Sequence, residues 1–70
     1  MYARTFRRAT HTRRFSITPS DAAGWQIRDE EDSDVLRSVS YDDWHRVERA
    51  RKAFAMEALR LQDAGWVEAT

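Results

Sequence analysis

The sequence predicts an α+β fold, in which a three-stranded antiparallel meander is covered on one face by a single long C-terminal helix. Three short segments alternate apolar and polar residues, and a later segment has a helical apolar period with stop and start signals at its ends. Short connections between consecutive strands favour the order β-β-β-α. The strands are expected at about residues 13–18, 25–29 and 35–41, and the helix at about residues 42–64.

Length and composition limit both size and chemistry. The chain has 70 residues, no cysteine and three tryptophans. A domain this short buries only about 60% of the surface that its unfolded chain exposes, so large aromatic side chains must supply much of the core. The absence of cysteine removes thiol chemistry and the usual structural zinc sites. No apolar run has the length of a membrane span or a signal peptide, so we expect a cytoplasmic protein with no membrane partner.

Charge is unevenly distributed along a chain whose formal net charge is zero. Residues 1–14 hold five arginines and no acid, residues 15–43 hold eight acids and two arginines, and residues 44–70 hold five bases and four acids. Residues 1–12 therefore predict a flexible basic N-terminal arm, with an organelle transit peptide as the alternative. Residues 13–70 are expected to form a single small α+β domain.

The three predicted strands place their apolar residues on one face. Phe15 alternates with polar neighbours in the first strand, and Trp25 does so in the second. The third strand breaks the pattern, because Arg37 shares a face with Val39 and Tyr41. Either a β-bulge near residues 36–38 corrects the register, or the strand lies at the edge of the sheet and the arginine reaches water along its stem. We favour the edge.

Signals at both ends define the helix. Ser40 fits a capping box and Asp42 is an alternative N-cap, while Gly65 permits a left-handed C-terminal stop that folds Trp66 back on the last turn. About 22 helical residues would span ~33 Å. A strand of six or seven residues spans only ~20–23 Å, so we expect the helix to overhang the sheet.

One face of the helix is apolar and predicts its contact with the sheet. Its members are Trp44, Val47, Ala50, Phe54, Ala55, Ala58 and Leu61. Arg51 lies within this stripe, where its stem packs while the guanidinium reaches water or stacks on a tryptophan; an anion-binding or interface role is the alternative. Met56 and Leu59 lie outside the stripe. Together with the overhang, they suggest a helix–helix contact between two copies.

No group of residues predicts catalysis or metal binding. His45 follows Asp42 by one helical turn, but the only other histidine, His11, belongs to the expected arm. The acidic run at residues 29–34 lacks the glycine and distal glutamate of an EF-hand loop, so it is expected to be a solvated hairpin tip. We therefore expect a non-enzymatic protein with no cofactor, no metal site and no catalytic residue.

These observations favour a small non-catalytic interaction module. We expect it to homodimerise or to dock on a protein partner through the helix flank and the open sheet face. The candidate interface residues are Met56, Leu59, Lys52 and Arg51.

The alternative function is weak, non-specific nucleic-acid binding through the basic arm and the basic helix face. Its candidate contacts are Arg4, Arg7, Arg8, Arg13, Arg14, Arg46 and Arg49. The element order from Arg13 to Ala64 resembles the arm-type DNA-binding domains of phage integrases, a resemblance that implies reading of the major groove by the sheet. The acidic residues 29–34 depart from that family, because they stand where those domains need positive charge.

Overall fold

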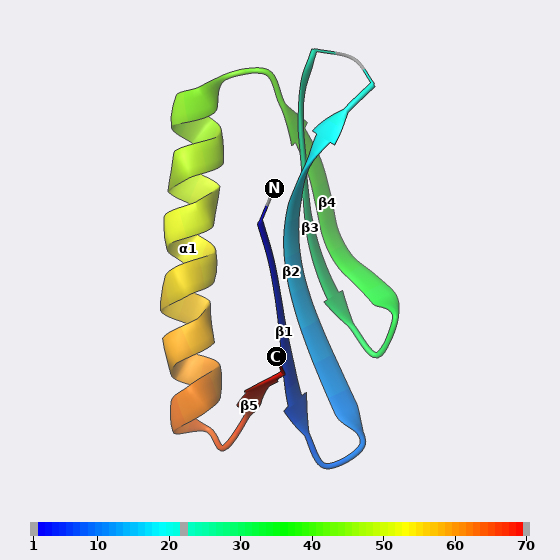
Figure 1. Cartoon of the computed structure of the whole chain (residues 1–70), viewed down its shortest axis with the longest axis vertical. Helices are drawn as coiled ribbons and strands as arrows, with labels where there is room; N and C mark the ends of the chain where they lie inside the picture. Colours follow the sequence, from blue (N-terminus) through cyan, green and yellow to red (C-terminus); the bar gives the residue numbers. More distant parts are fainter. Residues whose placement is uncertain (1, 22, 70) are drawn as a thin grey trace.

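The chain folds as an antiparallel sheet with one helix packed on one of its faces, as seen in a computed structural model that describes residues 2–21 and 23–69 (Figure 1). This confirms the predicted α+β class. Within the described residues the elements are β1 (Tyr2–Arg8), β2 (His11–Ser20), β3 (Gly24–Glu31), β4 (Asp34–Tyr41), α1 (Trp44–Asp63) and β5 (Val67–Ala69). The strand order across the sheet is β4-β3-β2-β1-β5. Met1, Ala22 and Thr70 lie outside the described residues.

The sheet has five strands over the described residues, whereas the sequence pattern predicts three. Residues 2–8, expected in a flexible arm, instead form β1, which pairs with β2 on one side and with β5 on the other. The β1–β2 turn is Ala9-Thr10, with Ala9 at a φ of 52°. This turn contains no glycine, asparagine or proline, the residue types that usually mark a tight hairpin. β5 was missed because three residues are too few to show an alternating pattern.

The three predicted strands are the cores of β2, β3 and β4, and each is longer than expected. Ile17 pairs with Ile27 and Ile27 with Val39, so their side chains share the face that meets the helix, as predicted. The ten residues of β2 span ~34 Å, and the 20 residues of α1 span ~30 Å. The predicted overhang of the helix is therefore wrong.

Both alternatives that the sequence allowed for Arg37, a β-bulge and a position on an edge strand, occur in the structure. The β3–β4 register shifts between Asp29 and Glu30, whose partners are Arg37 and Val35, and this leaves Leu36 as the extra residue of a bulge. β4 also lies at the edge of the sheet, with Arg37 exposed on the face toward the helix. The bulge therefore moves Val35 to the opposite face without removing Arg37 from the helix side.

The two helix ends match the prediction to different degrees. The N-cap is Asp43, whose side chain accepts a hydrogen bond from the His45 N–H at 2.9 Å, so neither Ser40 nor Asp42 caps the helix. At the other end Gly65 has a φ of 95°, and the Trp66 N–H donates to the Leu61 carbonyl at 2.9 Å. This is the predicted C-terminal stop. Across the described residues no helix has the length and hydropathy of a membrane span.

The core lies between α1 and the sheet and is centred on Phe54. Its ring stacks on Phe15 with centroids 4.8 Å apart, and on Tyr2 with centroids 6.2 Å apart. Phe6 of β1 is fully buried beside Phe15. Trp44, predicted to be part of the core stripe, is instead 53% exposed and packs against Trp25 at the margin. The buried apolar residues are Phe6, Phe15, Ile17, Ile27, Val47, Phe54, Ala58 and Leu61.

Candidate interaction surfaces

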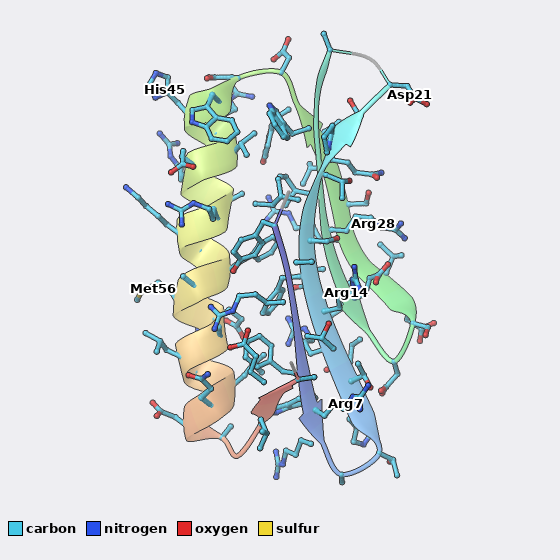
Figure 2. The ribbon with its side chains drawn as sticks, in the orientation of Figure 1. Arg7, Arg14, Asp21, Arg28, His45 and Met56 are labelled. Carbon is cyan, nitrogen blue, oxygen red and sulfur yellow. The ribbon has the colours of Figure 1, made fainter. Side chains whose placement is uncertain are left out.

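The outer face of α1 points directly away from the sheet and carries two large apolar side chains. Met56 is 64% exposed and Leu59 is 59% exposed. Figure 2 shows His45 and Met56 projecting from the side of the helix opposite the strands. At 100° per residue the outward positions recur at alternating spacings of four and three. This outer stripe consists of His45, Arg49, Lys52, Met56, Leu59 and Asp63.

Arg51, also proposed as an interface residue, lies away from the outer stripe. Its guanidinium forms a bidentate ion pair with Glu48, with nitrogen–oxygen distances of 3.0 and 3.2 Å. The stem lines a hollow beside Tyr2 and Trp44. The hydrogen bond to Glu48 raises the pKa of Arg51 and, conversely, lowers the pKa of Glu48. The structure therefore places Arg51 on the flank of the helix near β1, apart from Met56 and Leu59.

On the opposite flank, a groove runs between α1 and the edge strand β4. Arg37 enters it from β4, and Arg46 and Arg49 enter it from the helix. The Arg46 guanidinium lies 5.9 Å from the centre of the Tyr41 ring, within cation–π range. Within residues 2–21 and 23–69, no carboxylate forms an ion pair with any of these three arginines. The groove therefore presents three arginines that form no ion pair within the described residues.

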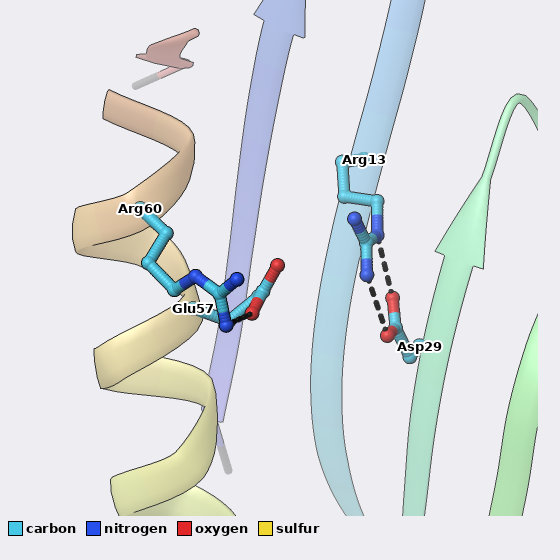
Figure 3. A network of polar contacts seen from close by, with 4 residues as sticks. All are labelled: Arg13, Asp29, Glu57 and Arg60. Carbon is cyan, nitrogen blue, oxygen red and sulfur yellow. Dashed lines mark hydrogen bonds and ion pairs between the residues drawn. The ribbon is translucent and has the colours of Figure 1, made fainter. Parts of the chain in front are cut away.

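The floor of this groove is apolar. Ala50 and Ala53 face it from the helix, and their small side chains leave a hollow that reaches Ile27, Val39 and Phe54. One carboxylate, that of Asp29, also borders this hollow. It is already bound by Arg13 through two hydrogen bonds of 2.9 Å each. Figure 3 shows this pair between β2 and β3 and, on the nearby helix turn, the looser Glu57–Arg60 pair at 3.7 Å.

Two of the N-terminal arginines proposed as nucleic-acid contacts are instead part of the fold. Arg4 donates to both carboxylate oxygens of Glu68 at 2.6 and 2.8 Å, which ties β1 to β5. Its guanidinium also lies 5.2 Å from the centre of the Phe6 ring. The hydrogen bond to Glu68 raises the pKa of Arg4, and the same bond lowers the pKa of Glu68. Arg13 is similarly bound to Asp29, so both cations are already neutralised.

Arg7 and Arg14 lie on the face of the sheet that points away from the helix. Figure 2 shows Arg7, Arg14 and Arg28 on the uncovered side of the sheet. Arg28 forms an ion pair with Glu30 at 3.0 Å. Arg8 is exposed at the end of β1. The uncovered face is therefore polar, with partly compensated positive charge.

The two hairpin tips at one end of the sheet are joined by Asp32. One of its carboxylate oxygens accepts a hydrogen bond from the Thr12 N–H, and the other lies 2.8 Å from Nδ1 of His11. This contact raises the pKa of His11 and lowers the pKa of Asp32. Only Asp32 and Ser33 of the acidic run form the hairpin tip, because residues 29–31 belong to β3 and Asp34 begins β4. The prediction of a solvated tip over all of residues 29–34 is therefore wrong for Asp29, which is largely covered and bound to Arg13. Among the described residues, no group of three or more histidines and carboxylates is placed to hold a metal ion.

Sequence reasoning placed Met56 and Leu59 outside the core stripe but did not anticipate the groove. The groove depends on which strand lies at the edge and on the two alanines that face it, and both are properties of the assembled fold. The available signals were the misplaced Arg37 and the small residues at positions 50 and 53. No family model, curated protein or solved structure matches the chain. The case for function therefore depends on these surfaces alone.

Proposed function

We propose that the protein is a small interaction module that homodimerises through antiparallel packing of α1 against α1 of a second copy. The observation that carries the proposal is the exposure of Met56 and Leu59, three residues apart on the outer stripe. Alternating spacings of three and four are those of helices that pack side by side. A domain with so small a core also gains stability by burying such a surface.

The outer stripe is complementary to itself when two helices run antiparallel. If Met56 of one copy faces Leu59 of the other, then residue number i of one helix faces residue number 115 − i of the second helix. Lys52 then faces Asp63 of the second copy, so charged pairs flank the apolar centre on both sides. A two-fold axis repeats every contact. The stripe therefore supplies both an apolar centre and a register.

The contact is small, and the dimer is expected to be weak. Two methionines and two leucines, each more than half exposed in one copy, contribute roughly 1 kcal/mol apiece when buried. Association itself costs at least about 4 kcal/mol in lost translational and rotational freedom. These four side chains therefore only about offset the cost of association, so the net affinity depends on the flanking charged pairs and on the rest of the outer stripe. A dissociation constant of about 1 mM, which needs a net gain of roughly 4 kcal/mol, is the tightest that we expect.

Sedimentation equilibrium from 10 µM to about 1 mM tests this dimer directly. Met56→Gln with Leu59→Gln is expected to leave a monomer, whereas Leu36→Gln, an equally exposed leucine on β4, serves as the matched control and is expected to dimerise as the wild type does. Lys52→Asp alone should weaken the dimer, and adding Asp63→Lys should restore it. A wild-type monomer at the highest concentration would refute the proposal.

Nucleic-acid binding remains the second proposal and has less support. Arg4 and Arg13 are already bound to carboxylates, and residues 2–8 are a strand rather than an arm free to wrap a duplex. Phosphate contacts then depend on arginines that lie on two separate surfaces. A salt titration of duplex DNA binding would measure this contribution, because log K falls with the number of phosphates neutralised.

A further inference from the structure

The groove between β4 and α1 has three properties that, apart from its one residue shared with the outer stripe, Arg49, the proposed dimer does not use. The first is charge. Arg37, Arg46 and Arg49 line one groove, and within the described residues none of them forms an ion pair. Unpaired cations gathered in one place repel one another and raise the local potential. Their arrangement favours an anionic partner.

The second property is the apolar hollow beneath the arginines. Val39 of β4 lies on one side of this hollow, and Ala50, Ala53 and Phe54 of α1 lie on the other. Since alanine leaves space that a longer side chain would fill, a methyl group of a partner's branched side chain can reach into the hollow, whose volume is about 30 Å³. A hollow beside a charged rim suits a partner that carries apolar and acidic side chains close together.

The third property is the free edge of β4. In the described sheet β4 pairs with β3 alone, so the backbone groups on its other side have no strand partner. The bulge at Leu36 ends the regular part of the strand, which leaves residues 37–41, or ~17 Å, for pairing. The side chains of Arg37, Val39 and Tyr41 all face the groove.

We propose that an extended acidic peptide binds in this groove by adding a strand to the free edge of β4. Alternate peptide side chains then face the helix. A branched apolar residue lies opposite Val39 and enters the hollow. Acidic residues two positions before and after it meet Arg37 at one end and Arg46 at the other. The recognised pattern is acid-x-apolar-x-acid, and the site does not depend on the dimer.

A nucleic acid is a poorer match to the same groove. Its phosphates would use the arginines but neither the apolar hollow nor the hydrogen-bonding edge of β4. A peptide uses all three features at once. Duplex DNA is therefore the competing ligand against which the peptide is tested.

The test is an NMR titration of the full ¹⁵N-labelled chain with the peptide acetyl-Gly-Glu-Thr-Val-Thr-Glu-Gly-amide. Binding with a dissociation constant on the order of 100 µM is expected, with shifts concentrated in the amides of residues 37–41 and 46–53. Replacing both peptide glutamates by lysine, or methylating the backbone nitrogens that pair with β4, should abolish binding. Absence of shifts at millimolar peptide, or shifts centred elsewhere, would overturn the proposal.

Matched variants separate this groove from general charge attraction. Arg37→Gln with Arg46→Gln is expected to weaken peptide binding roughly tenfold, the equivalent of two partly exposed charge pairs. Arg7→Gln with Arg14→Gln removes the same charge from the uncovered face and should change the affinity less than about twofold. Equal weakening by both pairs, or tighter binding of a duplex DNA oligonucleotide at residues 37–41, would overturn the peptide assignment.

Discussion

The two flanks of α1 are both rich in arginine, but they differ in whether a carboxylate of the described residues binds the guanidinium groups. On the flank closed by β1 and β5, Arg4 is held by Glu68 and packs on Phe6. On the flank open at β4, Arg37 and Arg46 line a groove without a carboxylate partner among the described residues. Arginines of the first kind serve the fold, and those of the second kind are available to a ligand. Whether a strand covers the flank therefore determines whether its arginines stabilise the fold or remain exposed.

The closed flank depends on β1, so the largest expected effect comes from Phe6→Ala. Phe6 is fully buried against Phe15, and truncating such a phenylalanine costs about 3–5 kcal/mol. That is most of the stability of a small domain. Urea unfolding followed by tryptophan fluorescence is expected to show a largely unfolded variant, while Val67→Ala on the exposed part of β5 stays folded. Wild-type stability for Phe6→Ala would mean that residues 2–8 behave as an arm.

Phe6 also shows why the sequence alone did not predict the strand β1. Its strand alternates Tyr2, Arg4, Phe6 and Arg8 toward the helix side. Arg4 is compatible with this covered face only because Glu68 and the Phe6 ring hold its guanidinium, and Arg8 is exposed at the end of the strand. Glu68 lies 64 positions away from Arg4. Local patterning cannot reveal a charge whose neutralising partner is that distant in sequence. The basic composition was therefore interpreted as an arm.

Features that depend on neighbouring residues alone were predicted correctly from the sequence. The helix stop at Gly65 needs only a left-handed residue and two backbone hydrogen bonds, and both are present. The outward position of Met56 and Leu59 follows from helical geometry alone. The N-cap was misplaced because residues 40, 42 and 43 all offer suitable side chains, and only the path of the chain out of β4 selects Asp43.

A covered ion pair should matter more than an exposed one, and Arg13→Met tests this next. Side chains of Arg13 and Asp29 are 15% and 18% exposed, so removing the arginine leaves a covered carboxylate without its partner. We expect a loss of about 2 kcal/mol in unfolding free energy. The matched control is Arg60→Met, because Arg60 is 80% exposed and 3.7 Å from Glu57; it should cost less than about 0.5 kcal/mol. Equal losses of unfolding free energy in the two variants would contradict the expectation that a covered ion pair contributes more than an exposed one.

The open flank should tolerate the loss of its cations. Arg37→Gln with Arg46→Gln is expected to change the unfolding free energy by less than about 0.5 kcal/mol, since no ion pair is broken and mutual repulsion falls. Arg4→Gln, which strands Glu68, should cost roughly 1 kcal/mol. Urea midpoints measured in the same buffer compare the two. Unfolding of the Arg37/Arg46 variant would show that the groove arginines support the fold after all.

The smallest effect concerns the exposed pair at the hairpin tips, His11 and Asp32. Because the Asp32 carboxylate raises the pKa of His11 above 6.5, the contact stabilises the fold fully below that value and is lost as the pH rises through the folded pKa. Because the pKa of Asp32 lies below 3.8, the contact is also lost in strong acid. In an NMR pH titration, Asp32→Asn should lower the pKa of His11, and the accompanying fall in the urea midpoint should be slight and larger at about pH 5.5 than at about pH 8. A fall in stability much smaller than that of Arg13→Met would show that an exposed ion pair contributes little to the fold, and that burial beneath β1, β5 and α1 makes an ion pair structural.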